Sequence, residues 1–327
     1  MYIKLQSKDI ILKLLPKGAT IYELQTKNKN GIFKNIVLTH KNIEQYNVNN
    51  EGYFGATCGR FAGRIEKGSF TIGKTLYELT KNENQNTTLH GGNKSLSNVL
   101  WDYTITEKEN KSICMFEYTS KDLEEGFPGN VKLKVEYILE NNTLTINYYG
   151  TTDKKTYLNL TNHSYFNLSD EDDRIYNHYL KLNADYFLDL NENLVPKNII
   201  SVQNTDFDYR TLRQIGNLKE QKDINIKDSL GINHPFKLKE DNIDYDLFLE
   251  DKKSGRTLKI KTTYPFIVLY TYNYPTNTEL LNRANKKHSA IAIEPQYPPN
   301  AVNDNRFNLK LTDIENPYFH NITYIFS

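Results

Sequence analysis

Short stretches in which apolar and polar residues alternate recur along most of this chain. The clearest are VKLKVEYILE at 131–140 and TLTINYY at 143–149. Alternation with a period of two predicts strands that bury one face and expose the other. Asn141 and Asn142 separate the two stretches, and because asparagine tolerates positive φ, we expect a two-residue hairpin turn between paired strands.

Other short apolar or alternating runs predict further strands at 101–106, 112–118, 258–262, 266–272, 291–293 and 322–326. We interpret the first two as a second antiparallel pair. Helical patterns are scarce, and only 212–218 and 279–286 favour short helices. The Asn-rich stretch 81–88 and the segment 191–228 are expected to be long loops, which often build sites in compact β proteins.

Many short strands with turn residues between them predict an all-β fold, namely a large antiparallel β-sandwich with few short helices. The sequence shows no internal repeat, no low-complexity linker and no break in composition. We therefore expect residues 1–327 to form a single domain.

The charge balance narrows the class of partners. The chain has 41 basic and 40 acidic residues and a net charge of +1, and because nucleic-acid and membrane-surface binding usually need a basic excess, we expect neither partner. No apolar run reaches the length of a signal peptide or of a membrane span. We expect a cytoplasmic protein, either a monomer or a homodimer. Cys58 and Cys114 leave one disulfide open but indicate no disulfide framework.

Candidate chemistry lies in five segments that combine polar groups with glycine or apolar neighbours. They are GATCGRFAGRI at 55–65, LHGG at 89–92, GFPG at 126–129, LNLTNHSYFNL at 158–168 and AIEPQYPPNAVN at 292–303. His163 fits a general acid, because the charge of imidazole changes near neutral pH; a hydrogen-bonded core histidine is the commoner alternative. Glu294, at a predicted strand end, fits a functional carboxylate and a surface salt bridge equally well.

The remaining candidates are basic side chains near glycines. His90 precedes two glycines that let the backbone approach a ligand closely, although an exposed histidine in a turn is the alternative. Arg60 and Arg64 could bind sugar hydroxyls or a carboxylate, or at least one could form a structural ion pair. No zinc spacing, phosphate-binding glycine loop or serine-nucleophile elbow is present, so we expect no metal and no organic cofactor.

Taken in chain order, the five segments resemble the aldose 1-epimerase (galactose mutarotase) family. GATCGRFAGRI resembles the family pattern G-A-T-x-G-R-x-A-N-R-I, and IEPQYPPNAVN resembles E-P-Q-x-F-P-D-A-x-N. LHGG, EEGFPGN and LTNHSYFNL resemble its other signatures, so that the likeness spans about residues 55–303. The resemblance implies a galactose mutarotase-like sandwich that interconverts the α and β anomers of a free hexose such as galactose or glucose.

The resemblance also implies roles for individual residues. Glu294 would be the general base on the C1 hydroxyl, and His163 the general acid on the ring oxygen. His90 and Arg64 would bind sugar oxygens. Further substrate-binding positions would be Gly63, Tyr165 and Asn233. On this basis we expect Glu294 to be ionised and His163 protonated before the sugar binds.

Three positions depart from the family pattern. Gly63 stands where the family has Asn, Asn233 where it often has Asp, and Val268 where some members have Gln. Because the implied acid and base are both present, these departures bear on sugar preference more than on reaction type.

Two alternatives stay open. A sugar-phosphate 1-epimerase would need a cationic pocket, for which Arg60, Arg64 and Lys67 are available. A non-catalytic sugar-binding protein or sensor on the same fold would not need a paired acid and base. A purely structural interaction domain would leave the five polar segments unexplained.

Overall fold

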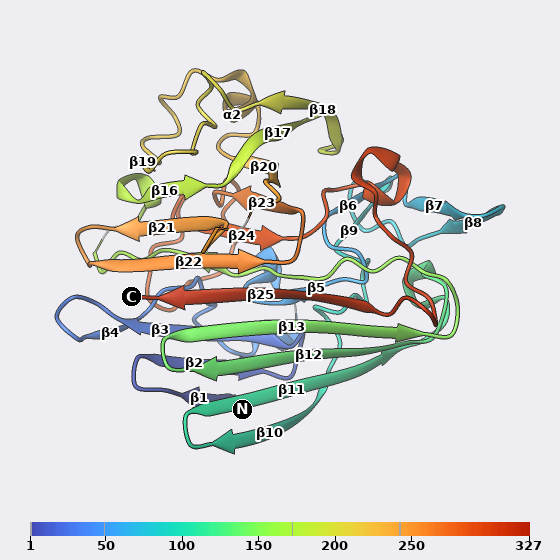
Figure 1. Ribbon diagram of the computed structural model, residues 1–327, viewed down its shortest axis with the longest axis horizontal. Helices are drawn as coiled ribbons and strands as arrows, with labels where there is room; N and C mark the ends of the chain where they lie inside the picture. The colour runs from blue at the N-terminus through green and yellow to red at the C-terminus, as the bar shows by residue number, and fades with distance from the viewer. Residues whose placement is uncertain (1, 49, 172, 242) are drawn as a thin grey trace.

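The computed structural model describes residues 2–48, 50–171, 173–241 and 243–327. In this part of the chain the largest sheet has nine strands, whose long members run side by side across the molecule (Figure 1). In spatial order they are β10 (Asp102–Lys108), β11 (Lys111–Ser120), β12 (Val131–Glu140), β13 (Thr143–Thr152), β25 (Tyr318–Phe326), β22 (Arg256–Thr262), β21 (Leu247–Asp251), β16 (Tyr179–Leu182) and β19 (Arg213–Gln214). Neighbouring strands in this sheet are antiparallel.

Two smaller sheets complete the main layers. The six-stranded sheet contains, in spatial order, β15 (Tyr165–Phe166), β24 (Ile291–Pro295), β23 (Phe266–Tyr270), β20 (Asn233–Leu238), β17 (Ala184–Leu190) and β18 (Pro196–Ser201). The four-stranded sheet contains β1 (Ile3–Gln6), β2 (Ile10–Leu15), β3 (Thr20–Lys27) and β4 (Phe33–Asn35). Three strand pairs stand apart, namely β5 (Thr57–Cys58) with β14 (Thr161–Asn162), β6 (Arg64–Glu66) with β9 (Thr87–Leu89), and β7 (Ser69–Ile72) with β8 (Thr75–Glu78).

Helices are short and few in the described residues. The α-helices are α1 (Gln45–Val48) and α2 (Ile224–Asp228). The 3₁₀ turns are η1 (Glu51–Tyr53), η2 (Glu124–Gly126), η3 (Ile175–Asn177), η4 (Ala301–Asn303) and η5 (Asn305–Phe307). The predicted all-β antiparallel sandwich with few short helices is confirmed. None of these helices is long and apolar enough to cross a membrane.

The two hairpins read from the sequence are present. β12 and β13 form an antiparallel pair in which Glu140 lies opposite Thr143 next to the turn. Asn141 in that turn has a positive φ of 52°. Every second residue of β12 is buried, as its alternation predicts. β10 and β11 form the other predicted pair. The strands predicted near 258–262, 266–272, 291–293 and 322–326 correspond to β22, β23, β24 and β25.

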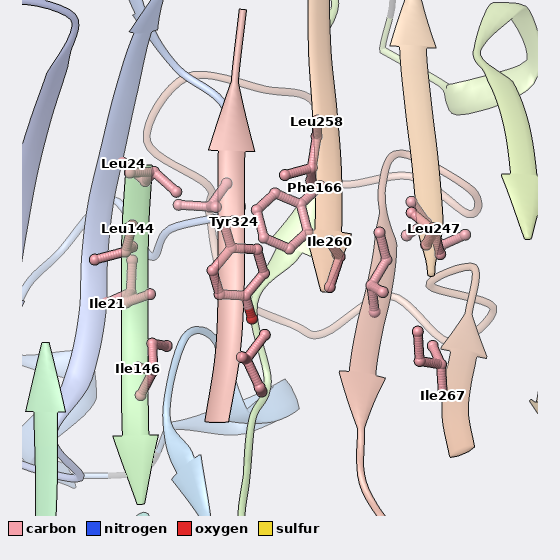
Figure 2. Close-up of a cluster of buried hydrophobic side chains, with 14 of the residues drawn as sticks. Ile21, Leu24, Leu144, Ile146, Phe166, Leu247, Leu258, Ile260, Ile267 and Tyr324 are labelled. Atoms are coloured by element: carbon pink, nitrogen blue, oxygen red, sulfur yellow. The ribbon is translucent and has the colours of Figure 1, made fainter. Parts of the chain in front are cut away.

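The main core lies where the three sheets meet. Figure 2 shows Leu144 of β13 and Tyr324 of β25, from the nine-stranded sheet, beside Ile21 of β3. Phe166 of β15 packs on Tyr324 with ring centroids 5.6 Å apart, and Ile267 of β23 belongs to the same cluster. This interior therefore packs the six-stranded sheet, which carries the candidate site, against the larger one.

The same core cluster includes residues near both ends of the described chain, from Ile3 to Phe326. A shared interior of this extent supports the expectation of one domain over residues 1–327, which stays a prediction. Cys58 and Cys114 are both buried free thiols, so the disulfide that the sequence left open is not formed between them.

Both predicted helices are wrong. In 212–218, Arg213–Gln214 form β19 beside β16, and Gly216 adopts a positive φ of 75° that interrupts a helix. In 279–286, Leu280 forms a β-bridge to His40. The side chain of Asn285 there donates to the carbonyls of Thr276 and Thr278. Asparagine competes in this way with the backbone hydrogen bonds that a helix needs.

The loop predictions are partly right. The segment 191–228 contains β18, β19 and α2, so it is not a continuous loop. The stretch 81–88 is irregular until β9 begins at Thr87. Leu194 of the first segment nevertheless lines the candidate site, and Glu83 of the second binds one of the site residues, as expected for long connections in a β protein.

Candidate active site

A pocket of about 200 Å³, open to solvent, lies against one face of the six-stranded sheet. Three neighbouring strands contribute a row of side chains to it. Glu294 of β24 pairs in register with Val268 of β23, and Val268 pairs with Pro235 of β20. Residues directly opposite one another on paired strands share a face of the sheet, so the sheet itself places the carboxyl group of Glu294 in the pocket wall.

All of the site residues predicted from the sequence line this one pocket. They are Gly63, Arg64, His90, His163, Tyr165, Asn233 and Glu294. Val268, the third position at which the chain departs from the family pattern, lines it as well. The fold therefore brings together side chains that are more than two hundred positions apart in the sequence.

His163 and Glu294 form a close pair of titratable groups in the pocket. His163 Nε2 lies 3.5 Å from Glu294 Oε2, and the two residues are only 4% and 3% exposed. The backbone of His163 is fixed on both sides, because its N–H donates to Ala56 O and its carbonyl accepts from Gly55 N–H. Glu294 is thus a buried carboxyl beside an imidazole, and the surface salt bridge considered from the sequence is wrong.

Burial moves the protonation equilibria of this pair away from the expected charged state. Removal from water raises the pKa of Glu294 to about 8, although the charge of Arg64 opposes the shift. The same loss of hydration lowers the pKa of His163 to about 4. Desolvation disfavours whichever form is charged, so the resting pair at neutral pH is a carboxylic acid beside a neutral imidazole. This corrects the expectation of an ionised Glu294 and a protonated His163.

His90 is buried at 7% exposure rather than exposed in a turn. The backbone N–H of Gly63 donates to His90 Nδ1 over 3.2 Å, so the proton of the neutral ring resides on Nε2, which is a donor. The ring packs on Tyr53 and His163 with centroids 4.6 Å and 5.1 Å apart. Burial, with the nearby His163 and Arg64, keeps the pKa of His90 well below its usual range. His90 therefore offers a neutral hydrogen-bond donor.

His90, His163 and Glu294 each have a potential metal-ligand atom, and these atoms lie within 4.8 Å of one another. Two histidines and a glutamate are a known zinc set. In His90, however, Gly63 N–H occupies Nδ1 and the proton occupies Nε2, so neither ring nitrogen offers a free lone pair. The arrangement fits an oxygen acceptor better than a metal ion, and the expectation of no metal stays a prediction.

Arg64 is held by a residue that the sequence did not single out. Its Nε and Nη2 donate to the two carboxylate oxygens of Glu83 over 2.7 Å and 2.8 Å. This bidentate pair fixes the guanidinium plane at the pocket and balances its charge. Arg60 has a different role, because it is buried and donates to Ser120 Oγ and to backbone carbonyls of residues 121 and 127–129. Arg60 does not line the pocket.

Glu83→Gln is expected to raise KM about 5-fold, which corresponds to the ~1 kcal/mol that a partly exposed ion pair contributes at most. Glutamine has an NH2 donor in place of one acceptor oxygen, so it cannot form the bidentate pair, and it leaves the charge of Arg64 unbalanced. That charge favours the ionised form of Glu294, so the pKa of Glu294, and with it the pH above which activity falls, should also decrease. Initial rates at several sugar concentrations and pH values measure both effects, with Glu117→Gln as the control, since Glu117 pairs with Lys134 away from the pocket. If the variant left both KM and the pH dependence of the rate unchanged, Arg64 would keep its position without Glu83.

The pocket also contains residues that sequence reasoning missed. Tyr53 packs on His90 and, at 5.9 Å between centroids, on His163. Tyr270 and Tyr274 line the pocket, and Tyr274 is 58% exposed at its rim. Aromatic faces of this kind suit the apolar faces of a sugar ring. Gln296 lies within a motif that was recognised but was not chosen as a site residue.

A buried acid–base pair, a neutral imidazole donor and an anchored guanidinium in one open pocket define a site for proton-transfer chemistry on a small polar molecule. A sequence profile of the aldose 1-epimerase family matches residues 1–324. The chain belongs to the aldose 1-epimerase family, as the five motifs indicated.

Individual relatives agree over nearly the whole chain. The chain is 35% identical to the galactose mutarotase of Sus scrofa, over 99% of this chain and 93% of that protein. It is 32% identical to the aldose 1-epimerase of Streptococcus thermophilus, over 92% of this chain and 86% of that protein. The structure of galactose 1-epimerase from Lactobacillus acidophilus superimposes with a TM-score of 0.88 at 28% identity, covering 100% of this chain and 94% of the other.

Proposed function

We propose that this chain is an aldose 1-epimerase that interconverts the α and β anomers of a free hexose such as galactose or glucose. The observation that carries the proposal is the 3.5 Å contact between His163 Nε2 and Glu294 Oε2 inside the pocket. A binding protein has no need of an acid and a base held together out of water, whereas anomer exchange needs both. Family membership supports the same reaction.

The chemistry requires one proton to leave and one to arrive. A base takes the proton of the C1 hydroxyl while an acid protonates the ring oxygen, so that the C1–O5 bond breaks and an open-chain aldehyde forms. Rotation about C1–C2 presents the other face of the aldehyde to the C5 hydroxyl. Ring closure then reverses both proton transfers and restores the pair.

At pH values between about 4 and about 8, Glu294 and His163 together hold one proton. Whichever of the two residues carries this proton is the acid, and the other is the base. We assign Glu294 as the base at the C1 hydroxyl and His163 as the acid at the ring oxygen. In this assignment the shared proton moves from Glu294 to His163 across their contact before the ring opens. Each positioned proton transfer typically contributes about 10²- to 10⁴-fold in rate.

The other pocket residues bind and orient the sugar. The Nε2–H of His90 and the guanidinium of Arg64 would donate to sugar oxygens that gain negative charge during ring opening. Tyr165, whose ring centroid lies 4.9 Å from that of His163, forms part of the same wall. Asn233 and the backbone at Gly63 complete the proposed binding set.

The charges of the pocket support a free sugar over a sugar phosphate. Arg64 is the one Lys or Arg among the described pocket-lining residues, and Glu83 already balances its charge. Arg60 is committed to backbone carbonyls, and the exposed Lys67 does not line the pocket. A phosphate dianion would therefore find little compensation. Glucose and glucose 6-phosphate, compared in the same assay, distinguish the two substrates.

Polarimetry of freshly dissolved α-D-galactose and α-D-glucose tests the proposed function. The protein is expected to speed the approach of optical rotation to its equilibrium value beyond the spontaneous and buffer-catalysed rates. If the protein accelerates anomer exchange of neither sugar, yet one of the sugars raises its melting temperature, the protein is a sugar-binding protein or sensor and the proposed epimerase activity is wrong.

The expected cellular setting, a cytoplasmic monomer or homodimer with only a small aldose as partner, remains a proposal from the sequence.

The activity is expected to have a bell-shaped pH dependence with limbs near pH 4 and pH 8. Below the lower limb both groups are protonated and no base is left, whereas above the upper limb both are deprotonated and no acid is left. A solvent-exposed glutamate and histidine would give limbs near about 4.3 and 6.5. Initial rates corrected for buffer catalysis measure the profile, and an upper limb near the exposed histidine value would contradict the burial argument.

A further inference from the structure

Gln296 is a buried amide in the wall of the pocket. It follows Glu294 by two positions along the chain that leaves β24, so both side chains lie on the same face. The residue is 1% exposed, and its Oε1 atom has no hydrogen-bond partner in the part of the chain that the structure describes. An unpaired buried amide oxygen destabilises a fold, and because Gln296 also lines the pocket, a bound molecule can supply hydrogen bonds to this amide.

Gly63 has no side chain that could fill the space beside the Gln296 amide. Its φ of +82° is a conformation that few side chains adopt, and a Cβ atom there would lie 3.6 Å from Gln296 Nε2 and 3.4 Å from Pro299 Cγ. Any larger side chain at this position would extend toward the amide. The glycine therefore keeps the space beside Gln296 available to a group that enters the pocket.

Asn159 fixes the positions of Gly63 and Gln296 by hydrogen bonds to the residues next to them in the chain. Its Nδ2 donates to Ala62 O over 3.2 Å and to Tyr297 O over 3.1 Å. Its Oδ1 accepts from Tyr297 N over 2.9 Å. Ala62 precedes Gly63 and Tyr297 follows Gln296, so one buried side chain ties the two segments together and holds the amide at a set position.

We propose that Gln296 determines sugar specificity by hydrogen-bonding one ring hydroxyl of the substrate, at C2, C3 or C4. This inference rests on the proposed function, because it assumes that an aldose occupies the pocket. An amide accepts through its oxygen and donates through its nitrogen, and a hydroxyl can satisfy either atom. Because Glu294 binds the C1 end and Gln296 follows it by about 6.6 Å along an extended chain, the amide reaches a neighbouring part of the same ring.

The test compares galactose with its 2-deoxy, 3-deoxy and 4-deoxy analogues on wild type and Gln296→Met. Methionine keeps the length of glutamine but lacks the amide. Wild type is expected to discriminate against one analogue through this contact by roughly 2- to 12-fold in kcat/KM. Gln296→Met should lose the discrimination against that one analogue and keep the wild-type discrimination against the other two. Its melting temperature should stay unchanged or rise, because an unpaired buried oxygen is removed.

Gln221→Met is the matched control. Gln221 also has an unpartnered Oε1 among the described residues, but it does not line the pocket. This variant should leave the discrimination among the four sugars unchanged. If Gln296→Met does not fold, Gln296→Asn replaces it, since asparagine withdraws the amide by one methylene and should lose the same discrimination.

The inference is overturned if the Gln296 variant lowers kcat/KM equally for all four sugars, or if it keeps the full discrimination of wild type. Either result with an active wild type leaves the proposed epimerase function standing. If wild type accelerates none of the four sugars, the proposed function has failed. Saturation-transfer NMR on the same sugars then shows whether Gln296→Met removes one ring-position contact or none, and the second result overturns the inference.

Discussion

Glu294→Gln is expected to lower kcat/KM for anomer interconversion about 10²- to 10⁴-fold, the usual contribution of a positioned general base. Glutamine has nearly the shape of the protonated carboxyl but cannot accept the proton of the C1 hydroxyl. Because burial raises the pKa of Glu294 to about 8, the native side chain is already neutral at rest. The variant should therefore fold as well as wild type, and circular dichroism with a melting curve checks this point.

Glu140→Gln makes the same chemical change at the end of β12, where Glu140 is half exposed and pairs with Lys111. It should leave the rate of anomer interconversion unchanged. If a folded Glu294→Gln kept more than about a tenth of the wild-type kcat/KM, its loss would be too small for a general base. Glu294 would then be a binding residue, and the proposed assignment of the base would be wrong.

His163→Asn is expected to reduce kcat/KM by a similar factor, about 10²- to 10⁴-fold, because the amide cannot protonate the ring oxygen. The two groups share one proton and act as a unit, so the double variant with Glu294→Gln should be little worse than either single variant. This non-additivity separates a coupled acid–base pair from two independent contacts. Polarimetric initial rates of the three variants give the comparison.

His320→Asn is the control for this change. His320 stacks on Tyr264 with ring centroids 4.0 Å apart and does not line the pocket. It should affect stability without removing activity. If the effects of His163→Asn and Glu294→Gln multiplied in the double variant, each residue would act separately, and the shared-proton arrangement would be refuted.

The strands could be predicted because their pattern is a local property. In β12 the apolar residues alternate with charged ones, and each takes the face that its polarity demands. Asn141 supplied the turn because its positive φ costs asparagine little. Helices could not be excluded in the same way, since the segment 279–286 is shaped by side-chain hydrogen bonds from Asn285 to carbonyls before the segment begins, which no periodicity reveals.

The main site residues could be predicted from sequence motifs, whereas their protonation and some of their supporting contacts could not. Arg64, His163 and Glu294 stand in recognisable sequence patterns, so their convergence on one pocket could be expected. Glu83 lies in an Asn-rich stretch with no pattern of its own, and only the fold shows that it binds Arg64. Tyr53 likewise reaches the pocket through tertiary packing. The protonation of the central pair depends on burial, which the sequence does not report.

The three departures from the family pattern share a location. Gly63, Asn233 and Val268 all line the pocket that holds Glu294 and His163. Val268 lies directly opposite Glu294 in the sheet register. The departures therefore change the surroundings of the sugar and leave the acid–base pair in place, which supports the expectation that they affect sugar preference more than reaction type.

Exchange NMR of galactose at anomeric equilibrium tests the central claim most directly, because it observes interconversion without any net change in concentration. With wild type, exchange cross-peaks between the α and β anomeric protons are expected, and they should vanish with Glu294→Gln and His163→Asn but persist with Glu140→Gln. Cross-peaks that survive in both folded pocket variants would contradict the claim that Glu294 and His163 carry the reaction. Their absence with wild type, for glucose as well, would contradict the claim that the chain is an epimerase of these sugars.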